Sequence, residues 1–172
     1  MSQITFITGG ARSGKSRLAE VLAMKYGDPL LYIATAGPGD REMTERIARH
    51  QERRGDSWQT IEEQYDLATV LSGHDSWFKA ILVDCVTLWL TNLLLKYEDK
   101  KVVLEEVRRT ASIFPSLRTP LILVSNEVGM GIIPDNPLGR AFCDLSGEAN
   151  QILAAAADEA YVTFSGLPLK LK

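Results

Sequence analysis

Cysteine and histidine are scarce in this sequence, which contains two of each among 172 residues. Cys85 and Cys143 show neither metal-ligand nor redox spacing, so we expect reduced thiols and a cytoplasmic protein. No apolar run approaches the roughly 18 residues that a membrane span requires. The net charge of −3 gives no electrostatic case for broad binding to nucleic acid or to an anionic membrane. Together these features argue against a cysteine-based site, a membrane span and a nucleic-acid partner.

What remains is the composition of a globular protein. Hydrophobic residues make up 45% of the chain and charged residues 24%, and this length is enough for one substantial core. We therefore expect a single nucleotide-binding catalytic domain over residues 1–172, without internal repeats or linkers. A strand pattern begins at Ile4, which leaves no room for a signal peptide before it.

The most informative stretch combines a short apolar run, a glycine-rich turn and the start of a helix. It satisfies the P-loop pattern G-x4-G-K-[ST] in the strand-then-helix context that the pattern requires. Backbone N–H groups of such a loop surround phosphates, while Lys15 would reach the β/γ oxygens and Ser16 would ligate Mg²⁺. The alternative is an ordinary glycine-rich turn. The nucleotide-binding residues expected here are Gly9, Gly10, Ala11, Arg12, Ser13, Gly14, Lys15 and Ser16.

Strand and helix patterns alternate along the rest of the chain, which predicts an α/β fold. We expect a P-loop NTPase fold, RecA-like, whose mostly parallel sheet carries helices on both faces. After the run that begins at Ile4, the predicted strands are Leu30–Ala34, Trp58–Glu62, Ala80–Asp84, Pro120–Ser125, Ala160–Ser165 and a terminal hairpin strand within Leu167–Lys172. The predicted helices are Arg17–Tyr26, Arg41–Arg53, Asp66–Leu71, Thr87–Leu95, Val102–Phe114 and Leu138–Ala157, with Glu98–Lys101 as a charged connection.

A carboxylate ends the apolar strand that precedes Cys85. Asp84 follows Ile81-Leu82-Val83, which is how a Walker B carboxylate is presented. With a P-loop upstream, Asp84 would hold Mg²⁺ directly or through water. The alternative is a cap for the following helix.

A histidine lies among arginines in the predicted helix Arg41–Arg53. Arg46 and Arg54 are four residues either side of His50 and would share its helix face. Positive charge nearby favours the neutral, nucleophilic imidazole, and the guanidinium groups would neutralise phosphate oxygens during attack. Met43 and Ile47 share this face too, so a half-buried structural histidine remains the alternative. The other histidine, His74, has no arginine close to it in the sequence.

At this point the sequence resembles the bifunctional adenosylcobinamide kinase/adenosylcobinamide-phosphate guanylyltransferase family of cobalamin biosynthesis. The resemblance spans essentially the whole chain, and the Asn-Glu-Val-Gly-Met-Gly block is its specific feature. The matching motifs are Gly9–Ser16, Leu31–Thr35, Arg46-Ile47 with His50, Arg54 and Trp58, Asp84-Cys85, Thr87–Asn92, Asn126–Pro134, and the end from Arg140 through Asn150-Gln151 and Ala157-Asp158-Glu159 to Gly166 and Leu171-Lys172.

The resemblance implies two reactions at overlapping sites. In the first, a nucleoside triphosphate (ATP or GTP) phosphorylates the aminopropanol hydroxyl of adenosylcobinamide, with Mg²⁺ present. In the second, GMP from GTP is held on a histidine, which falls on His50, and passes to the new phosphate to give adenosylcobinamide-GDP.

The resemblance also implies further contacts. Glu62 would accept hydrogen bonds from the N1–H and N2–H donors of guanine, or else be a solvated charge beside Glu63. Asn126 and Glu127 would shape the corrinoid side or a subunit contact, and no second carboxylate is identified as the kinase base. The implied nucleotide contacts are Ala34, Thr35, Ala36, Gln51, Glu52, Arg53, Arg54, Glu62 and Asp84.

The chain departs from the family pattern just before Trp58. Gly55 stands where the family usually has proline, which loosens the backbone after the predicted nucleophile helix. The resemblance further suggests a homo-oligomer, a trimer by analogy.

Two other functions fit part of the sequence. A plain P-loop kinase for a small alcohol would transfer phosphate but form no covalent nucleotide adduct. A RecA-like nucleotide-switch ATPase would be stimulated by a macromolecule such as nucleic acid. The net negative charge of the chain argues against this function. Neither explains His50 among its arginines together with the glycine block after Asn126.

Overall fold

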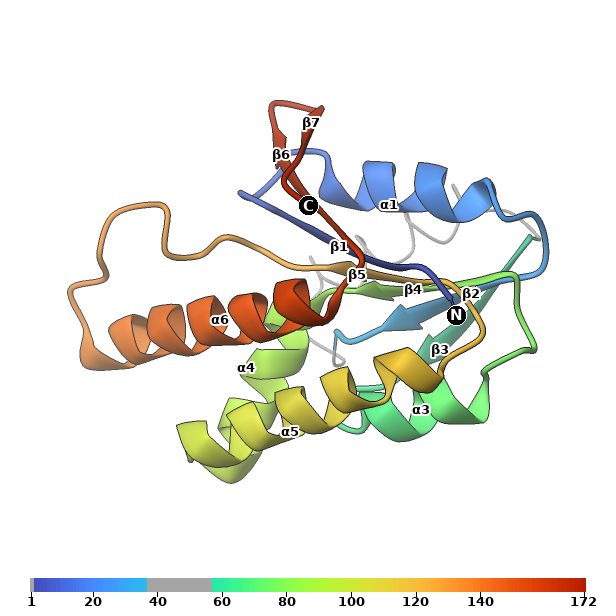
Figure 1. The fold of residues 1–172 in the computed structure, drawn as a ribbon. Helices are drawn as coiled ribbons and strands as arrows, with labels where there is room; N and C mark the ends of the chain where they lie inside the picture. The colour runs from blue at the N-terminus through green and yellow to red at the C-terminus, as the bar shows by residue number, and fades with distance from the viewer. Residues whose placement is uncertain (1, 37–56) are drawn as a thin grey trace.

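The computed structural model describes residues 2–36 and 57–172, and its centre is a seven-stranded sheet (Figure 1). The strand order is β3-β2-β4-β5-β1-β6-β7. The strands are β1 (Ile4–Gly9), β2 (Leu30–Ala34), β3 (Trp58–Glu62), β4 (Ala80–Asp84), β5 (Leu121–Val124), β6 (Glu159–Phe164) and β7 (Leu167–Lys170). The helices are α1 (Lys15–Met24), α3 (Leu67–Gly73), α4 (Val86–Tyr97), α5 (Lys100–Ser112) and α6 (Pro137–Ala156), with a 3-10 turn at Phe114–Ser116.

Neighbouring strands are parallel except at the C-terminal edge, where β6 and β7 form an antiparallel hairpin. Strand β1 lies between β5 and β6, with Ile7 level with Val124 on one side and Tyr161 on the other. Residues of β1, β2 and β5 are buried throughout. Strands covered on both faces read as continuous apolar runs, which is why these segments were recognisable in the sequence.

Helices cover both faces of the sheet, as predicted. Helix α1 lies on one face, where Ala19 and Ala23 pack with Ile7 and Leu82. Helices α3, α4, α5 and α6 lie on the other (Figure 1).

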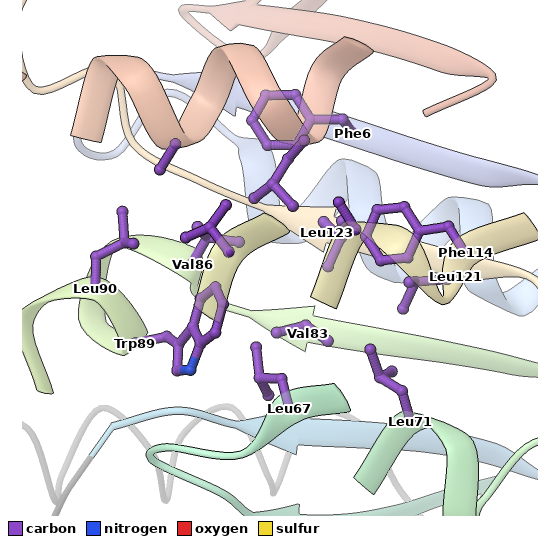
Figure 2. Close-up of a cluster of buried hydrophobic side chains, with 14 of the residues drawn as sticks. Phe6, Leu67, Leu71, Val83, Val86, Trp89, Leu90, Phe114, Leu121 and Leu123 are labelled. Atoms are coloured by element: carbon purple, nitrogen blue, oxygen red, sulfur yellow. The ribbon is translucent and has the colours of Figure 1, made fainter. Parts of the chain in front are cut away.

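The larger core cluster lies under these four helices (Figure 2). Trp89, Leu90 and Phe114 meet Phe6 and Val83 from the sheet in this cluster. The indole Nε1 of Trp89 donates to the carbonyl of Tyr65 (2.8 Å), so the one polar atom of this side chain is satisfied.

The predicted helix boundaries need correction at α5. The segment Glu98–Lys101 was expected to be a connection, yet α5 begins at Lys100 because the Asp99 carboxylate caps it by accepting from the Lys101 N–H (2.8 Å). The helix ends at Ser112 rather than Phe114, because Pro115 stands in the 3-10 turn that follows. The predicted helix Arg41–Arg53 lies outside the described residues. Within 2–36 and 57–172, no helix is both long and apolar enough to cross a membrane.

Two leucines on α4 test the importance of this core. Leu90 is fully buried, whereas Leu95, five residues along the helix, is 73% exposed. Leu90→Ala is expected to lower the free energy of unfolding by about 2–5 kcal/mol, since it removes buried methyl groups and leaves a cavity. The matched control Leu95→Ala should change it by about 0.5 kcal/mol or less. Urea titration followed by circular dichroism measures both, and equal effects would contradict the assignment of the core.

Candidate nucleotide-binding site

Two glycines of the loop between β1 and α1 are required by geometry. Gly9 has φ +150°, and a Cβ there would lie 2.6 Å from the carbonyl oxygen of Thr163. Gly14 has φ +100°, and its Cβ would lie 3.0 Å from the Cα of Gly166. Both positions combine left-handed backbone with contact to another chain segment, which glycine alone tolerates. These are the two fixed glycines of the P-loop pattern.

The β6–β7 hairpin holds the loop in place. The hydroxyls of Ser13 and Thr163 share a buried hydrogen bond of 2.6 Å. The Gly166 N–H donates to the carbonyl of Ser13 (2.9 Å). The sequence analysis gave Thr163 and Gly166 no role in the loop, because their contacts depend on β6 lying beside β1.

The lysine of the loop is folded back against it. Lys15 is 7% exposed, and its Nζ donates to the carbonyl of Gly10 (2.6 Å). Burial lowers the pKa of Lys15, although the nearby acidic side chains Asp84 and Glu127 oppose that effect. A phosphate oxygen would give this ammonium group a stronger partner than a carbonyl.

Three of the predicted contact residues lie at one edge of the sheet. Ala34 is level with Glu62 on β3 and with Asp84 on β4, so all three stand at the carboxyl ends of adjacent parallel strands. Ligands bind at this edge in open α/β sheets. Glu62 is exposed there and Asp84 is half-buried. The structure therefore brings these positions together.

The donor chemistry at this edge fits a magnesium ion. Mg²⁺ usually takes one or two carboxylates and completes its shell with waters and substrate phosphates. Asp84 would supply the carboxylate and the half-buried Ser16 the hydroxyl. In the described part of the chain, no three acidic, histidine or cysteine side chains gather closely enough to hold a metal by themselves.

Thr35, predicted as a nucleotide contact, has its side chain engaged elsewhere. Its hydroxyl donates to the carbonyl of Cys85 (2.7 Å) and accepts from the N–H of the same residue (2.8 Å). The Asn92 side chain donates to the Thr35 carbonyl (2.8 Å). Burial raises the pKa of the Cys85 thiol to about 12, so this thiol is inert. Thr35 thus fixes the chain directly after Asp84, and Ala36 follows it half-buried.

A second carboxylate lies beside the loop, which the sequence analysis did not anticipate. Glu127 was expected on the corrinoid side or at a subunit contact. Its N–H donates to the carbonyl of Gly9 (3.0 Å), and its Oε1 accepts from the Thr8 hydroxyl (2.7 Å). The sequence shows that Glu127 follows a strand, but it does not reveal that this strand pairs with β1.

The remaining predicted residues lie in a segment whose structure is not described. His50, Gln51, Glu52, Arg53 and Arg54 are all outside the described residues, as is Gly55.

Comparison with known proteins identifies the family. Residues 5–171 match the profile of the family described as cobinamide kinase / cobinamide phosphate guanyltransferase. The chain belongs to this family. Its members are kinases and guanylyltransferases, and this chain is accordingly an enzyme that uses nucleoside triphosphates.

Relatives in this family match over nearly the full length. The bifunctional adenosylcobalamin biosynthesis protein CobP of Pseudomonas aeruginosa is 45% identical over 166 residues, covering 96% of this chain and 95% of that protein. The protein CobU of Escherichia coli K12, which carries the same description, is 38% identical over 180 residues, covering 96% and 98%.

Solved structures confirm the expected P-loop NTPase fold. A KaiC-like protein from Pyrococcus horikoshii superposes with a TM-score of 0.56 at 16% identity, covering 93% of this chain and 70% of that one. The RadB recombinase has a TM-score of 0.56 at 15% identity, covering 93% and 73%.

The close approach at Gly9 gives a direct test of the loop. Gly9→Ala would force a methyl group against the Thr163 carbonyl and is expected to strain the backbone by about 1–3 kcal/mol, weakening nucleotide affinity about tenfold or more. A Cβ at Gly10 would meet nothing within 4 Å, so Gly10→Ala should leave thermal stability unchanged. Calorimetric unfolding and titration with nucleotide measure these effects. Full affinity in Gly9→Ala would contradict the described loop geometry.

Proposed function

We propose that this chain, acting as one domain, phosphorylates adenosylcobinamide and then converts the product to adenosylcobinamide-GDP with GTP. The observation that carries the proposal is a complete P-loop, with its buried lysine and braced glycines, in a chain that matches the kinase and guanyltransferase family from end to end. The names of the relatives, which describe bifunctional adenosylcobalamin biosynthesis proteins, support the corrinoid as substrate.

In the kinase step, the loop would bind the phosphates of ATP or GTP. Backbone N–H groups from Gly9 to Ser16 would surround them at the start of α1. The Lys15 ammonium group would give up its hydrogen bond to the Gly10 carbonyl and bind the β/γ oxygens of the nucleotide instead. Ser16 and Asp84 would hold Mg²⁺, which when bound neutralises charge that develops on the phosphates.

In the guanylyl transfer step, His50 would attack the α-phosphate of GTP. The bond from its imidazole nitrogen to phosphorus forms as the bond to pyrophosphate breaks, leaving GMP on the histidine. The phosphate of the corrinoid then displaces the histidine. Glu62, at the sheet edge with Ala34, would select guanine through its N1–H and N2–H donors, while Gln51 to Arg54 would contact the phosphates or ribose.

The proposed compartment and oligomeric state of the enzyme rest on the same resemblance. We propose a cytoplasmic homo-oligomer, a trimer by analogy with the family. Cysteines without redox spacing support the reducing compartment.

Variants of the two histidines can distinguish the covalent guanylyl step from phosphoryl transfer. Incubation with α-³²P-GTP and Mg²⁺, followed by denaturing electrophoresis, should label the protein with an acid-labile, base-stable bond. His50→Ala should lose the label by more than about 100-fold, as expected when a nucleophile is removed, yet keep kinase activity. His74, whose ring contacts the Val70 carbonyl, provides the control His74→Ala, which should label normally. A His50→Ala protein that still labels would exclude His50. A folded, GTP-binding protein that never labels would favour a plain kinase.

Asp84 gives a test of the metal site. Asp84→Asn keeps the size of the side chain but removes its negative charge, so Mg²⁺-dependent turnover should fall by about 100-fold or more, the range lost when electrostatic stabilisation is removed. The Mg²⁺ concentration for half-maximal rate should also rise. Kinase assays over a Mg²⁺ series measure both, and an unchanged Mg²⁺ dependence would remove Asp84 from the site.

A further inference from the structure

Polar side chains from two helices hold the turn that carries Glu127. Asn150 on α6 accepts from the Ser125 hydroxyl (2.6 Å) and donates through Nδ2 to the Asn126 carbonyl (3.1 Å). The Asn126 N–H in turn donates to the hydroxyl of Thr87 on α4 (2.8 Å). Buried networks that are satisfied in this way hold a backbone in one conformation. The turn after β5 is therefore fixed from α4 and α6.

The carboxylate of Glu127 is held by one of its two oxygens. Oε1 accepts from the Thr8 hydroxyl (2.7 Å) and from Nδ2 of Asn150 (3.2 Å). Among residues 2–36 and 57–172, no hydrogen bond or ion pair of Oε2 is found. A carboxylate oxygen has room for further hydrogen bonds. Glu127 thus presents an oriented oxygen with free acceptor capacity.

The Glu127 carboxylate lies beside the phosphate loop, where phosphoryl transfer would take place. Glu127 is bonded through its N–H to the first glycine of the loop, and its charge is close enough to Lys15 to act on that ammonium group. Lys15 marks the position of the transferred phosphoryl group in a P-loop. The acceptor hydroxyl must approach that same group, so a proton acceptor is needed there.

The neighbouring carboxylate has a different task. Asp84 ends β4 and would hold Mg²⁺ together with Ser16, so its lone pairs would be directed at the ion. Glu127 follows β5, the strand between β4 and β1. The two carboxylates therefore reach Lys15 from different strands and can be altered separately.

We propose that Glu127 is the general base of the kinase step, held by Thr8 and Asn150 so that Oε2 accepts the proton of the acceptor hydroxyl. The inference rests on the kinase activity proposed above. As the hydroxyl oxygen forms its bond to the γ-phosphorus, the bond between that phosphorus and the β,γ-bridging oxygen breaks and the nucleoside diphosphate leaves. The proton moves to Oε2 and is then released to water, which restores the carboxylate.

The decisive variant is Glu127→Gln, because the amide oxygen can still accept from Thr8 and Asn150. Kinase turnover with adenosylcobinamide, ATP and Mg²⁺ should fall by about 10²–10⁴-fold, the usual contribution of a general base. The KM for ATP and the Mg²⁺ concentration for half-maximal rate should stay within about threefold, since no phosphate or metal contact is removed. Labelling with α-³²P-GTP should be retained, because that step needs no proton acceptor at the γ-phosphate.

Each other outcome overturns the assignment. Kinase turnover within a few-fold of the unaltered enzyme would show that Glu127 is structural. A loss that high Mg²⁺ repairs would make it a metal ligand, and loss of both turnover and labelling would indicate damage to the loop. An unaltered enzyme without kinase activity would instead refute the proposed function itself.

Thr8 offers a second, independent variant for the positioning of Glu127. Thr8→Val keeps the shape of the side chain but removes the hydroxyl that donates to Oε1. Kinase kcat should fall about tenfold, since a loosened base aligns less often, with the KM for ATP unchanged. Thr8→Ser retains a hydroxyl and should restore most of the rate. Equal rates in the valine and serine variants would show that Thr8 does not position the base.

Discussion

A positive charge that is almost buried at the start of α1 constrains the whole carboxyl edge of the sheet. Lys15 is 7% exposed, and an ammonium group in such a place needs partners to remain charged. In the described structure these are the Gly10 carbonyl, directly bonded, and the charges of Asp84 and Glu127 at longer range. The carboxylates that would serve phosphoryl transfer are therefore the same groups that stabilise the charged form of Lys15 when no substrate is bound.

The rigidity of the phosphate loop comes from outside the loop. Gly9 lies against the Thr163 carbonyl, and Ser13 is bonded to both Thr163 and Gly166. The hairpin at the end of the chain thus completes a site that begins at residue 9. A loop fixed in this way keeps its N–H groups directed at one position, so little ordering is left to be done when phosphate binds.

Much of this fold could be predicted because its central strands are buried. The bounds of β2, β3 and β4 agree with the prediction, and β2 and β4 are short apolar runs that end next to a polar residue. The start of helix α5 was predicted two residues too late, because it is set by a hydrogen bond to the Asp99 side chain that the sequence pattern does not show. The position of Glu127 beside the loop and the role of Thr163 were not predicted for a different reason: strands far apart in sequence become neighbours of β1 only through the strand order. Local patterns carry no information about that order.

The strand order also places the two carboxylates proposed for the kinase step on different strands. Asp84 ends β4 and Glu127 follows β5, and separate sets of hydrogen bonds hold the chain after Asp84 and the carboxylate of Glu127. Thr35 and Asn92 hold the chain after Asp84, whereas Thr8 and Asn150 hold Glu127. Because the two sets share no residue, a substitution in one should leave the other in place. This independence would allow Asp84 to hold a metal ion while Glu127 accepts the proton, as proposed.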